Sequence, residues 1–192
     1  MKVVTAAEMR EIDRISIEEC RIPGEVLMNN AGKAVADFIK TNFDFIKADI
    51  FCGTGNNGGD GFVVARLALL AGYETHVVLV ARPEDIQGDA AVFMDVYKSM
   101  GGHIEVAPDE ATAAAAVRKL SRCAVLVDAV LGTGTRGEVR GPLRAAIEAW
   151  PSVYTVSVDV PSGMNADTGK PCGVCVRADV TVTFAFAKQG FT

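Results

Sequence analysis

The stretch Gly53-Thr54-Gly55-Asn56-Asn57-Gly58-Gly59-Asp60-Gly61 lies between a short apolar segment, residues 49–52, and a longer one, residues 62–71. It contains the spacing G-x-G-x-x-G after an expected strand and before an expected helix, which is where a dinucleotide-binding loop lies. Glycines let the backbone approach a pyrophosphate, and the amides at a helix N-terminus favour an anion. The stretch therefore predicts a nucleotide-binding turn. The alternative is a tight glycine turn with Asn56 or Asn57 in a left-handed conformation.

Two features separate this stretch from a plain phosphate-binding loop. Asn56, Asn57 and Asp60 are polar side chains that such a loop does not need. The next expected strand ends at Val80-Ala81-Arg82, without the acidic residue that would bind a ribose. The stretch therefore departs from the usual dinucleotide fingerprint.

On either side of this stretch, segments with the pattern of a strand alternate with segments with the pattern of a helix. The first helix begins at a capping box formed by Thr5 and Glu8. Such alternation predicts an α/β protein, a Rossmann-like three-layer sandwich with a central, mostly parallel sheet and helices on both faces. The expected helices are residues 5–20, 26–40, 62–71, 89–100, 110–120 and 142–150, and the expected strands are residues 49–52, 76–80, 103–106, 124–130, 153–160 and 180–185.

Length and composition limit the classes of protein to consider. The 192 residues are the length of one domain, residues 1–192. The 19 Lys and Arg against 24 Asp and Glu give a net charge of −5, which disfavours a nucleic-acid partner. No apolar run reaches the roughly 18 residues of a membrane-spanning helix, and the first residues have no signal-peptide pattern. The five cysteines are scattered and odd in number, so we expect a cytoplasmic protein. Two histidines are too few for a His-rich metal site.

A second glycine-rich turn follows the expected strand that carries Asp128. It reads Gly132-Thr133-Gly134-Thr135-Arg136-Gly137 and precedes another expected helix. An anion can bind to such loop amides, and Arg136 and Arg140 can add phosphate contacts. The alternative is an ordinary flexible loop between a strand and a helix.

The third candidate site is Asp159, at the end of an expected buried strand and followed by Val160-Pro161-Ser162-Gly163. Open parallel sheets place ligands and catalytic groups at that end of their strands. Poor solvation there raises the pKa of a carboxyl group toward the range of a general acid or base. The alternative is a structural aspartate that accepts hydrogen bonds from loop amides.

Asn57, Asp128 and Ser162 come from three different strand ends, and all three carry hard oxygen atoms. Oxygen donors suit a hard cation, and the lack of several carboxylates favours a monovalent one.

These motifs resemble those of one known family, the YjeF N-terminal domain proteins, known as NAD(P)H-hydrate epimerases. The resemblance rests on Gly55-Asn56-Asn57-Gly58-Gly59-Asp60-Gly61, Val127-Asp128-Ala129-Val130-Leu131-Gly132-Thr133-Gly134, Arg140-Gly141-Pro142, Val158-Asp159-Val160-Pro161-Ser162-Gly163, Ala166-Asp167-Thr168-Gly169 and Ala178-Asp179-Val180-Thr181-Val182-Thr183-Phe184 with Lys188 and Gly190. At the front, Met9-Arg10-Glu11-Ile12-Asp13 and Leu27-Met28 with Ala31-Gly32 also match. The resemblance covers essentially the whole chain.

The resemblance implies an enzyme that interconverts the two epimers of hydrated NADH or NADPH at carbon six of the nicotinamide ring. It implies a potassium ion held by Asn57, Asp128 and Ser162. It also implies a homodimer, and cooperation with a separate NAD(P)H-hydrate dehydratase. The residues implied to contact the hydrate are Asn56, Asn57, Gly58, Gly59, Asp60, Gly132, Thr133, Gly134, Thr135, Arg136, Gly137, Glu138 and Asp159.

Epimerisation needs the ring hydroxyl to leave and to return on the other face, so the site needs an acid and a base. Asp159 is the first candidate for both steps, and Asp60 and Lys188 are the alternatives. For Lys188, an ordinary exposed lysine is an equally good interpretation. We expect Asp159→Ala to abolish exchange and to leave folding intact.

The sequence departs from the family pattern in two places. Asn29 stands where many relatives have an acidic residue, and relatives continue beyond the position of Thr192, so we expect the last strand and helix to be missing. Two rival functions are a non-catalytic nucleotide-binding or protein-interaction module and a nicotinamide oxidoreductase. A non-catalytic module should have lost the Asn and Asp residues of the loops, which are present here. An oxidoreductase should have a ribose-binding acid and a substrate domain, and the sequence shows neither.

Overall fold

The computed structural model describes residues 2–44, 47–120 and 125–192. Its main sheet has six strands in the order β4-β3-β2-β5-β6-β7, and every neighbouring pair is parallel. The strand order reverses between β2 and β5, which is where open α/β sheets bind ligands. The strands are β2 (Lys47–Cys52), β3 (Glu74–Leu79), β4 (Ile104–Val106), β5 (Val125–Ala129), β6 (Thr155–Val158) and β7 (Val180–Val182).

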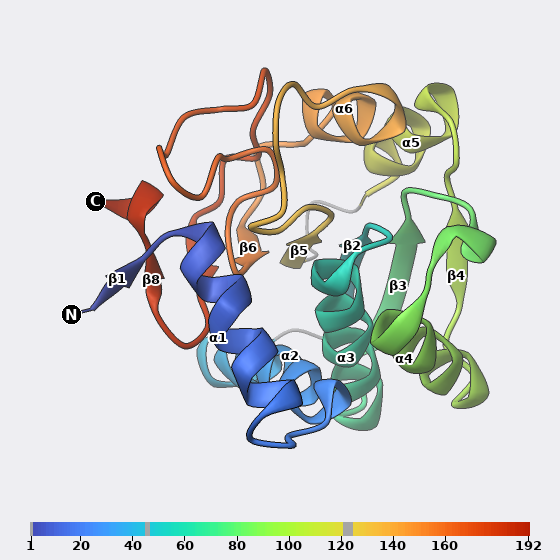
Figure 1. Ribbon diagram of the computed structural model, residues 1–192. Coiled ribbons are helices and arrows are strands. Elements are labelled where there is room, and N and C mark those ends of the chain that lie inside the picture. The colour runs from blue at the N-terminus through green and yellow to red at the C-terminus, as the bar shows by residue number, and fades with distance from the viewer. Residues whose placement is uncertain (1, 45–46, 121–124) are drawn as a thin grey trace.

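Helices cover both faces of this sheet, as Figure 1 shows. One face packs against α2 (Gly24–Asn42), α3 (Asn56–Leu70) and α4 (Gly88–Ser99), and the other against α5 (Glu110–Arg118) and α6 (Gly141–Glu148). Alternate residues of each strand enter the two cores, so that Ile50 faces α3 and Phe51 faces α5 and α6. The predicted three-layer α/β fold is confirmed.

Most expected elements are present, with shifts at their ends. The capping box of Thr5 and Glu8 is present at the start of α1 (Ala6–Glu18). The largest shift is at α3, which begins at Asn56 rather than at residue 62, so most of the glycine-rich stretch is helical. The alternative of a left-handed Asn56 or Asn57 is wrong, because neither residue has a positive φ. Residue 124, expected at the start of a strand, lies outside the described residues.

One pair of strands was not expected from the sequence. β1 (Val3–Val4) runs parallel to β8 (Ala187–Lys188), with Val4 opposite Lys188. Strands of two residues are too short to show a period of two, so their pattern carries no signal. The pair brings the two ends of the chain side by side (Figure 1).

Among residues 2–44, 47–120 and 125–192, no helix is both long and apolar enough to span a membrane. The four cysteines in the described part of the chain, Cys20, Cys52, Cys172 and Cys175, are free thiols.

Candidate active site at the carboxyl edge of the sheet

Three segments meet at the carboxyl edge of the sheet, one after each of β2, β5 and β6. In the order of the sheet these strands are neighbours, so their following segments are neighbours too. The segments carry the three predicted motifs: the glycine-rich stretch, the second glycine turn and the loop of Asp159. Parallel pairing therefore gathers at one edge residues that are separated by about a hundred positions in the chain.

Glycines in the first segment allow two backbone segments to touch. A Cβ atom on Gly58 would lie 2.0 Å from the carbonyl oxygen of Gly53, and one on Gly53 would lie 2.0 Å from that of Val130. A Cβ atom on Gly59 would meet the Met28 side chain at 2.5 Å. These three glycines therefore serve packing. Gly55, the N-cap of α3, is different, because a Cβ atom there would meet nothing within 4 Å. The open side of the turn is at Gly55.

Two of the three predicted cation ligands, Asn57 and Ser162, contact the backbone of Leu131, and the third, Asp128, contacts Ser162. Asn57 Nδ2 donates to the Leu131 carbonyl oxygen (3.1 Å), and Ser162 Oγ accepts from the Leu131 amide (2.8 Å). Ser162 Oγ donates in turn to Oδ1 of Asp128, and the Ser162 amide donates to Oδ2 (2.8 Å). Ser157 Oγ also donates to Oδ2 (2.7 Å). The structure therefore brings Asn57, Asp128 and Ser162 into one connected group.

The charge of Asp128 decides whether this group suits a cation. The side chain is fully buried, and its hydrogen-bond donors are neutral. Within the described ranges it forms no ion pair. Burial raises the pKa of Asp128, and hydrogen bonds from Ser162 oppose that shift. A buried carboxylate that contacts two hydroxyl groups and lacks a cationic side chain fits a monovalent cation. Clusters of three or more His, Cys, Asp or Glu side chains able to hold a metal are absent from the described residues.

Asp159 is held in an uncommon backbone conformation with a buried lysine as its partner. Its φ is 64°, in the left-handed region that Asp and Asn tolerate better than most residues. Its Oδ1 accepts from Thr183 Oγ1 (3.2 Å), from the Phe184 amide (3.2 Å) and from Lys188 Nζ. One of these donors is the ammonium group of Lys188, so Asp159 has a buried cation as its partner.

Lys188 is not the exposed lysine of the simpler interpretation, because its side chain is only 1% exposed. Nζ donates to Asp159, to Thr183 Oγ1 (2.9 Å) and to the Phe184 carbonyl oxygen (3.0 Å), which uses all three ammonium protons. The residue lies on β8, the strand that the sequence did not reveal. Because Lys188 contacts Asp159, it remains a candidate for the acid or base of the reaction.

The charges of Asp159 and Lys188 also affect the pKa of two further carboxyl groups, those of Asp60 and Asp13. Burial raises the pKa of Asp60 well above its ordinary value, the charges of Asp159 and Asp13 raise it further, and Lys188 opposes them. Burial and the charge of Asp159 also raise the pKa of Asp13 on α1, again opposed by Lys188. The sequence reasoning missed Asp13. It is an exposed residue of α1, four positions after Met9, and its pattern carried no signal.

The second glycine turn is held by its own hydrogen bonds. Thr135 donates to the Gly132 carbonyl oxygen from both its amide (3.2 Å) and its hydroxyl (2.9 Å). Arg136 donates to the carbonyl oxygens of Thr133 (3.2 Å) and Thr135 (3.0 Å), and its side chain remains 45% exposed. Glu138 pairs with Arg144 (2.7 Å), outside the turn. A Cβ atom on Gly134 would meet nothing within 4 Å, so this turn also has an open side.

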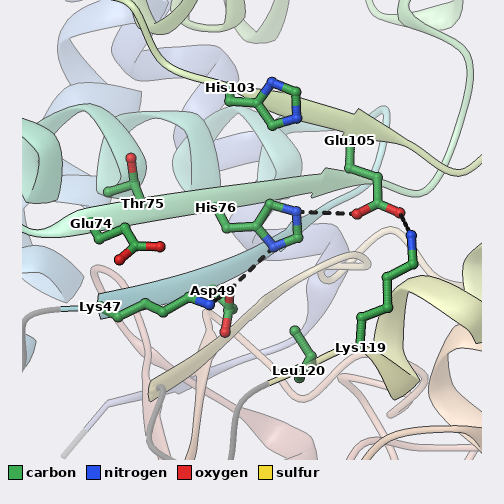
Figure 2. Close-up of a pocket in the computed structure, with 9 residues that line it drawn as sticks. All are labelled: Lys47, Asp49, Glu74, Thr75, His76, His103, Glu105, Lys119 and Leu120. Carbon is green, nitrogen blue, oxygen red and sulfur yellow. Dashed lines mark hydrogen bonds and ion pairs between the residues drawn. The ribbon is translucent and has the colours of Figure 1, made fainter.

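A cavity of about 440 Å³ lies elsewhere, among residues at the amino ends of β2 and β3 and on β4 (Figure 2). The close-up shows His76 between two carboxylates. Its Nδ1 lies 3.2 Å from Asp49 Oδ1, and its Nε2 lies 3.2 Å from Glu105 Oε2. Glu105 also accepts from Lys119 Nζ (2.7 Å). None of the predicted site residues lines this cavity, so it is separate from the candidate active site.

Comparison with known proteins supports the resemblance read from the motifs. The family described as "YjeF-related protein N-terminus" matches residues 24–190. A protein of Rhodopirellula baltica named NAD(P)H-hydrate epimerase is 38% identical over 98% of this chain and 76% of its own length. One of Moorella thermoacetica named Bifunctional NAD(P)H-hydrate repair enzyme Nnr is 45% identical over 99% of this chain. The chain spans only 37% of that bifunctional relative.

A solved structure agrees with these sequence matches. The crystal structure of the yeast protein ynu0, YNL200c, superimposes with a TM-score of 0.87 at 25% identity, covering all of this chain and 83% of the yeast chain. Motifs, fold and relatives point the same way: the chain belongs to the family of YjeF-related protein N-terminus domains.

Proposed function

We propose that this protein is an epimerase that interconverts the R and S forms of hydrated NADH and NADPH, and so takes part in nicotinamide nucleotide repair. The observation that carries the proposal is that Asp60, near the N-terminus of α3, and Asp159, directly after β6, both lie at the carboxyl edge of the sheet. This is the edge at which the strand order reverses between β2 and β5. Three of the similar proteins are named NAD(P)H-hydrate epimerases. An acid, a base and a dinucleotide site in one place are what epimerisation requires.

The reaction exchanges one hydroxyl group for another on the same carbon. The ring nitrogen supplies an electron pair, the bond from carbon six to the hydroxyl breaks, and an acid protonates the departing oxygen to give water. Water then adds to the opposite face of the iminium-like ring, while a base accepts the proton that it loses. Atoms and charges balance, and no oxidant is consumed.

The two carboxyl groups have environments that favour different roles. Burial and neighbouring negative charges raise the pKa of Asp60, which favours its protonated form. Asp159 accepts three hydrogen bonds at one oxygen, one of them from the Lys188 ammonium group, which holds that carboxyl group in a fixed position. We assign Asp60 to protonate the departing hydroxyl and Asp159 to accept the proton of the incoming water. Lys188 is a positioning residue that orients Asp159.

Asn57, Asp128 and Ser162 would hold the potassium ion, since they form one connected group around a buried carboxylate. When bound, the ion would supply positive charge next to the nucleotide-binding loops. The protein residues would position the dinucleotide. There is open space beside Gly55, at the start of α3, and beside Gly134, in the turn 132–137, so backbone amides at both places could contact it. We propose that Asn56 to Asp60, Gly132 to Glu138 and Asp159 contact the hydrate.

The decisive experiment mixes the purified protein with the pure R or S hydrate of NADH or NADPH and follows the two epimers by proton NMR. Exchange without net oxidation supports an epimerase. Net oxidation would support the oxidoreductase, and binding without exchange would support the non-catalytic module. Asp159→Asn should remove exchange. Exchange at the unchanged rate in that variant would refute the assignment of Asp159.

We also propose a cytoplasmic homodimer that works with an NAD(P)H-hydrate dehydratase. The length of the bifunctional relatives, which extend well beyond this chain, supports a second activity nearby. Free thiols agree with a reducing compartment. Ile15, Ile17, Ile22 and Val26 are exposed apolar side chains on α1, the following turn and the start of α2, and they suit contact with a second copy. Sedimentation velocity should show a dimer that Ile17→Glu weakens. A monomer at micromolar concentration would contradict the dimer.

A further inference from the structure

The motif Ala166-Asp167-Thr168-Gly169 has no role in the proposed reaction, yet it lies beside the second glycine turn. Oδ1 of Asp167 accepts a hydrogen bond from the amide of Ala6, at the start of α1 (2.6 Å). Oδ2 of the same carboxylate lies 3.8 Å from Nη2 of Arg136, in the turn. One carboxylate therefore joins the first helix of the chain to a turn that we propose contacts the hydrate.

The loop that carries Asp167 is held by hydrogen bonds of its own. The side-chain oxygen of Asn165 accepts from the amides of Asp167 and Thr168, both at 3.0 Å. The amide of Gly190, after β8, donates to the Ala166 carbonyl oxygen (2.7 Å), and Ala166 itself is buried. These contacts fix the backbone on both sides of Asp167, so its carboxylate is held in place before any ligand binds.

The guanidinium group of Arg136 is occupied at one nitrogen only. Nη1 donates to the carbonyl oxygens of Thr133 (3.2 Å) and Thr135 (3.0 Å), which uses both of its protons. Among the described residues, neither Nε nor Nη2 donates a hydrogen bond, because the Asp167 oxygen at 3.8 Å is beyond hydrogen-bond distance. The Nε–Nη2 edge is one with which arginine binds two oxygens of a phosphate at once. That edge keeps its protons, and the side chain is 45% exposed.

We propose that Asp167 is a positioning residue, which holds the Arg136 guanidinium group so that its Nε–Nη2 edge receives a phosphate of the bound dinucleotide. The carbonyl oxygens of Thr133 and Thr135 hold one end of the planar group, and the charge of Asp167 holds the other. This inference rests on the proposed function, since it names a recognition element for the pyrophosphate of the hydrate. The reacting carbon is not contacted, so binding is affected and the chemical step is not.

Asp167 has two opposite effects on an anion. Its negative charge repels a phosphate, and its ion pair orients the arginine that binds the phosphate. Both side chains are partly exposed, at 33% for Asp167 and 45% for Arg136, so water and salt screen the repulsion. Bidentate binding needs a guanidinium plane in a fixed orientation, and salt does not replace that orientation. Loss of the Asp167 charge should therefore weaken binding of the dinucleotide.

Asp167→Asn is the decisive variant, because its side-chain oxygen can still accept from the Ala6 amide while the charge toward Arg136 is lost. At about 0.15 M salt, KM for the hydrate should rise roughly fivefold, and kcat should stay within about twofold of the wild type. Glu148→Gln is the matched control, since Glu148 pairs with Arg144 (2.8 Å) on the exposed side of α6. This control should leave KM unchanged. An unchanged KM in Asp167→Asn would overturn the inference.

A double-mutant cycle separates this role from a purely structural one. Arg136→Gln alone should raise KM roughly tenfold, because the charged donor to the phosphate is lost. In that background Asp167→Asn should have no further effect, since the residue that it positions is absent. Increases in KM that multiply in the double variant would show that Asp167 does not act through Arg136, and would overturn the inference.

A second measurement separates this inference from the proposed function. Nitrogen-15 NMR relaxation of the Arg136 Nε–H group, without substrate, reports how rigidly the guanidinium group is held, and Arg136→Gln identifies the signal. Greater mobility in Asp167→Asn supports the positioning role even if the wild type exchanges no epimers, in which case only the epimerase assignment fails. Equal mobility overturns the inference whatever the enzyme does. Inorganic pyrophosphate should shift the wild-type signal, and a signal that does not move would overturn the phosphate contact.

Discussion

Lys188 Nζ donates a hydrogen bond to Oδ1 of Asp159, across 29 positions of the chain, and the lysine side chain is almost completely buried. The ammonium group thereby joins β8 to the loop after β6. Because β8 also pairs with β1, the first strand of the chain supports the same carboxylate. The first and last strands of the chain therefore hold the candidate base in position.

Lys188→Met should destabilise the protein by about 3 kcal/mol, because it leaves the Asp159 carboxylate without its cation in a largely buried position. Urea unfolding followed by circular dichroism measures the change. Lys170→Met is the matched control, since Lys170 is exposed, and it should stay within about 0.5 kcal/mol of the wild type. Equal effects of the two substitutions would show that the ion pair contributes little.

Asp159→Asn and Asp159→Ala should differ in stability while both lose exchange. At φ 64° an alanine Cβ is strained by roughly 1–2 kcal/mol, whereas Asn tolerates this region. Loss of the general base should slow exchange by at least about a hundredfold in both. Asp159→Ala should therefore lower the stability of the protein, contrary to the expectation from the sequence that folding stays intact. Thermal unfolding separates the two variants, and equal melting temperatures would argue against backbone strain.

Gly58→Ala and Gly55→Ala test the glycine-rich stretch, since both add one methyl group to the same turn. The Gly58 methyl would overlap the Gly53 carbonyl oxygen, so we expect a loss of about 3 kcal/mol in the free energy of unfolding. Gly55 has a φ of −84° and open space beside it, so Gly55→Ala should cost less than about 1 kcal/mol. Gly55→Ala should also bind the hydrate more weakly than the wild type does, and titration calorimetry measures that affinity. Comparable stability losses would contradict the assignment of packing to Gly58.

The stability of the wild type should fall as the pH rises through the folded pKa of His76. Both ring nitrogens face carboxylate oxygens, so both hydrogen bonds form only when the ring is protonated. The hydrogen bond to Asp49 raises the pKa of His76, and burial partly opposes it. The folded pKa is above the unfolded value of about 6.5, so the contribution is complete below 6.5 and is lost as pH rises through the folded pKa.

His76→Gln removes this contribution. The difference in unfolding free energy between wild type and variant should be largest near pH 6 and should shrink toward pH 8.5. His103→Gln is the control, because His103 stacks on His76 (6.5 Å between ring centroids) and makes no ion pair among the described residues. A difference that does not change with pH would rule out a protonated His76.

Potassium should raise the melting temperature of the wild type more than sodium or choline at equal ionic strength, because an ion that binds only the folded state stabilises it. Asp128→Asn removes the buried charge and should abolish the difference between the ions. Asp179→Asn is a control outside the proposed ligand group, since Asp179 accepts from the Thr155 amide at the other end of β6. Equal melting temperatures of the wild type in potassium and sodium would speak against the ion site.

Much of the candidate site could be predicted because its residues belong to local motifs at strand ends. Asp128, Asp159 and the glycine-rich stretch each follow an apolar segment, and parallel strands bring their carboxyl ends to one edge. The joining of Asn57, Asp128 and Ser162 around Leu131 follows from that geometry.

The start of α3 could not be predicted, because glycine has a low helix propensity and the stretch resembles a loop. Contacts outside the helix reverse that preference: Gly58 meets the Gly53 backbone, and Gly59 leaves room for Met28.

The sequence by itself determined the α/β class, the order of the elements and the positions of the three motifs, because these depend on local periodicity and on glycine at strand ends. Tertiary structure decided which charges meet. β1 and β8 are two residues each, and Lys188 reaches Asp159 only after both ends of the chain have paired. Burial then raises the pKa of Asp60, since the cost of removing a carboxylate from water depends on every element that surrounds it.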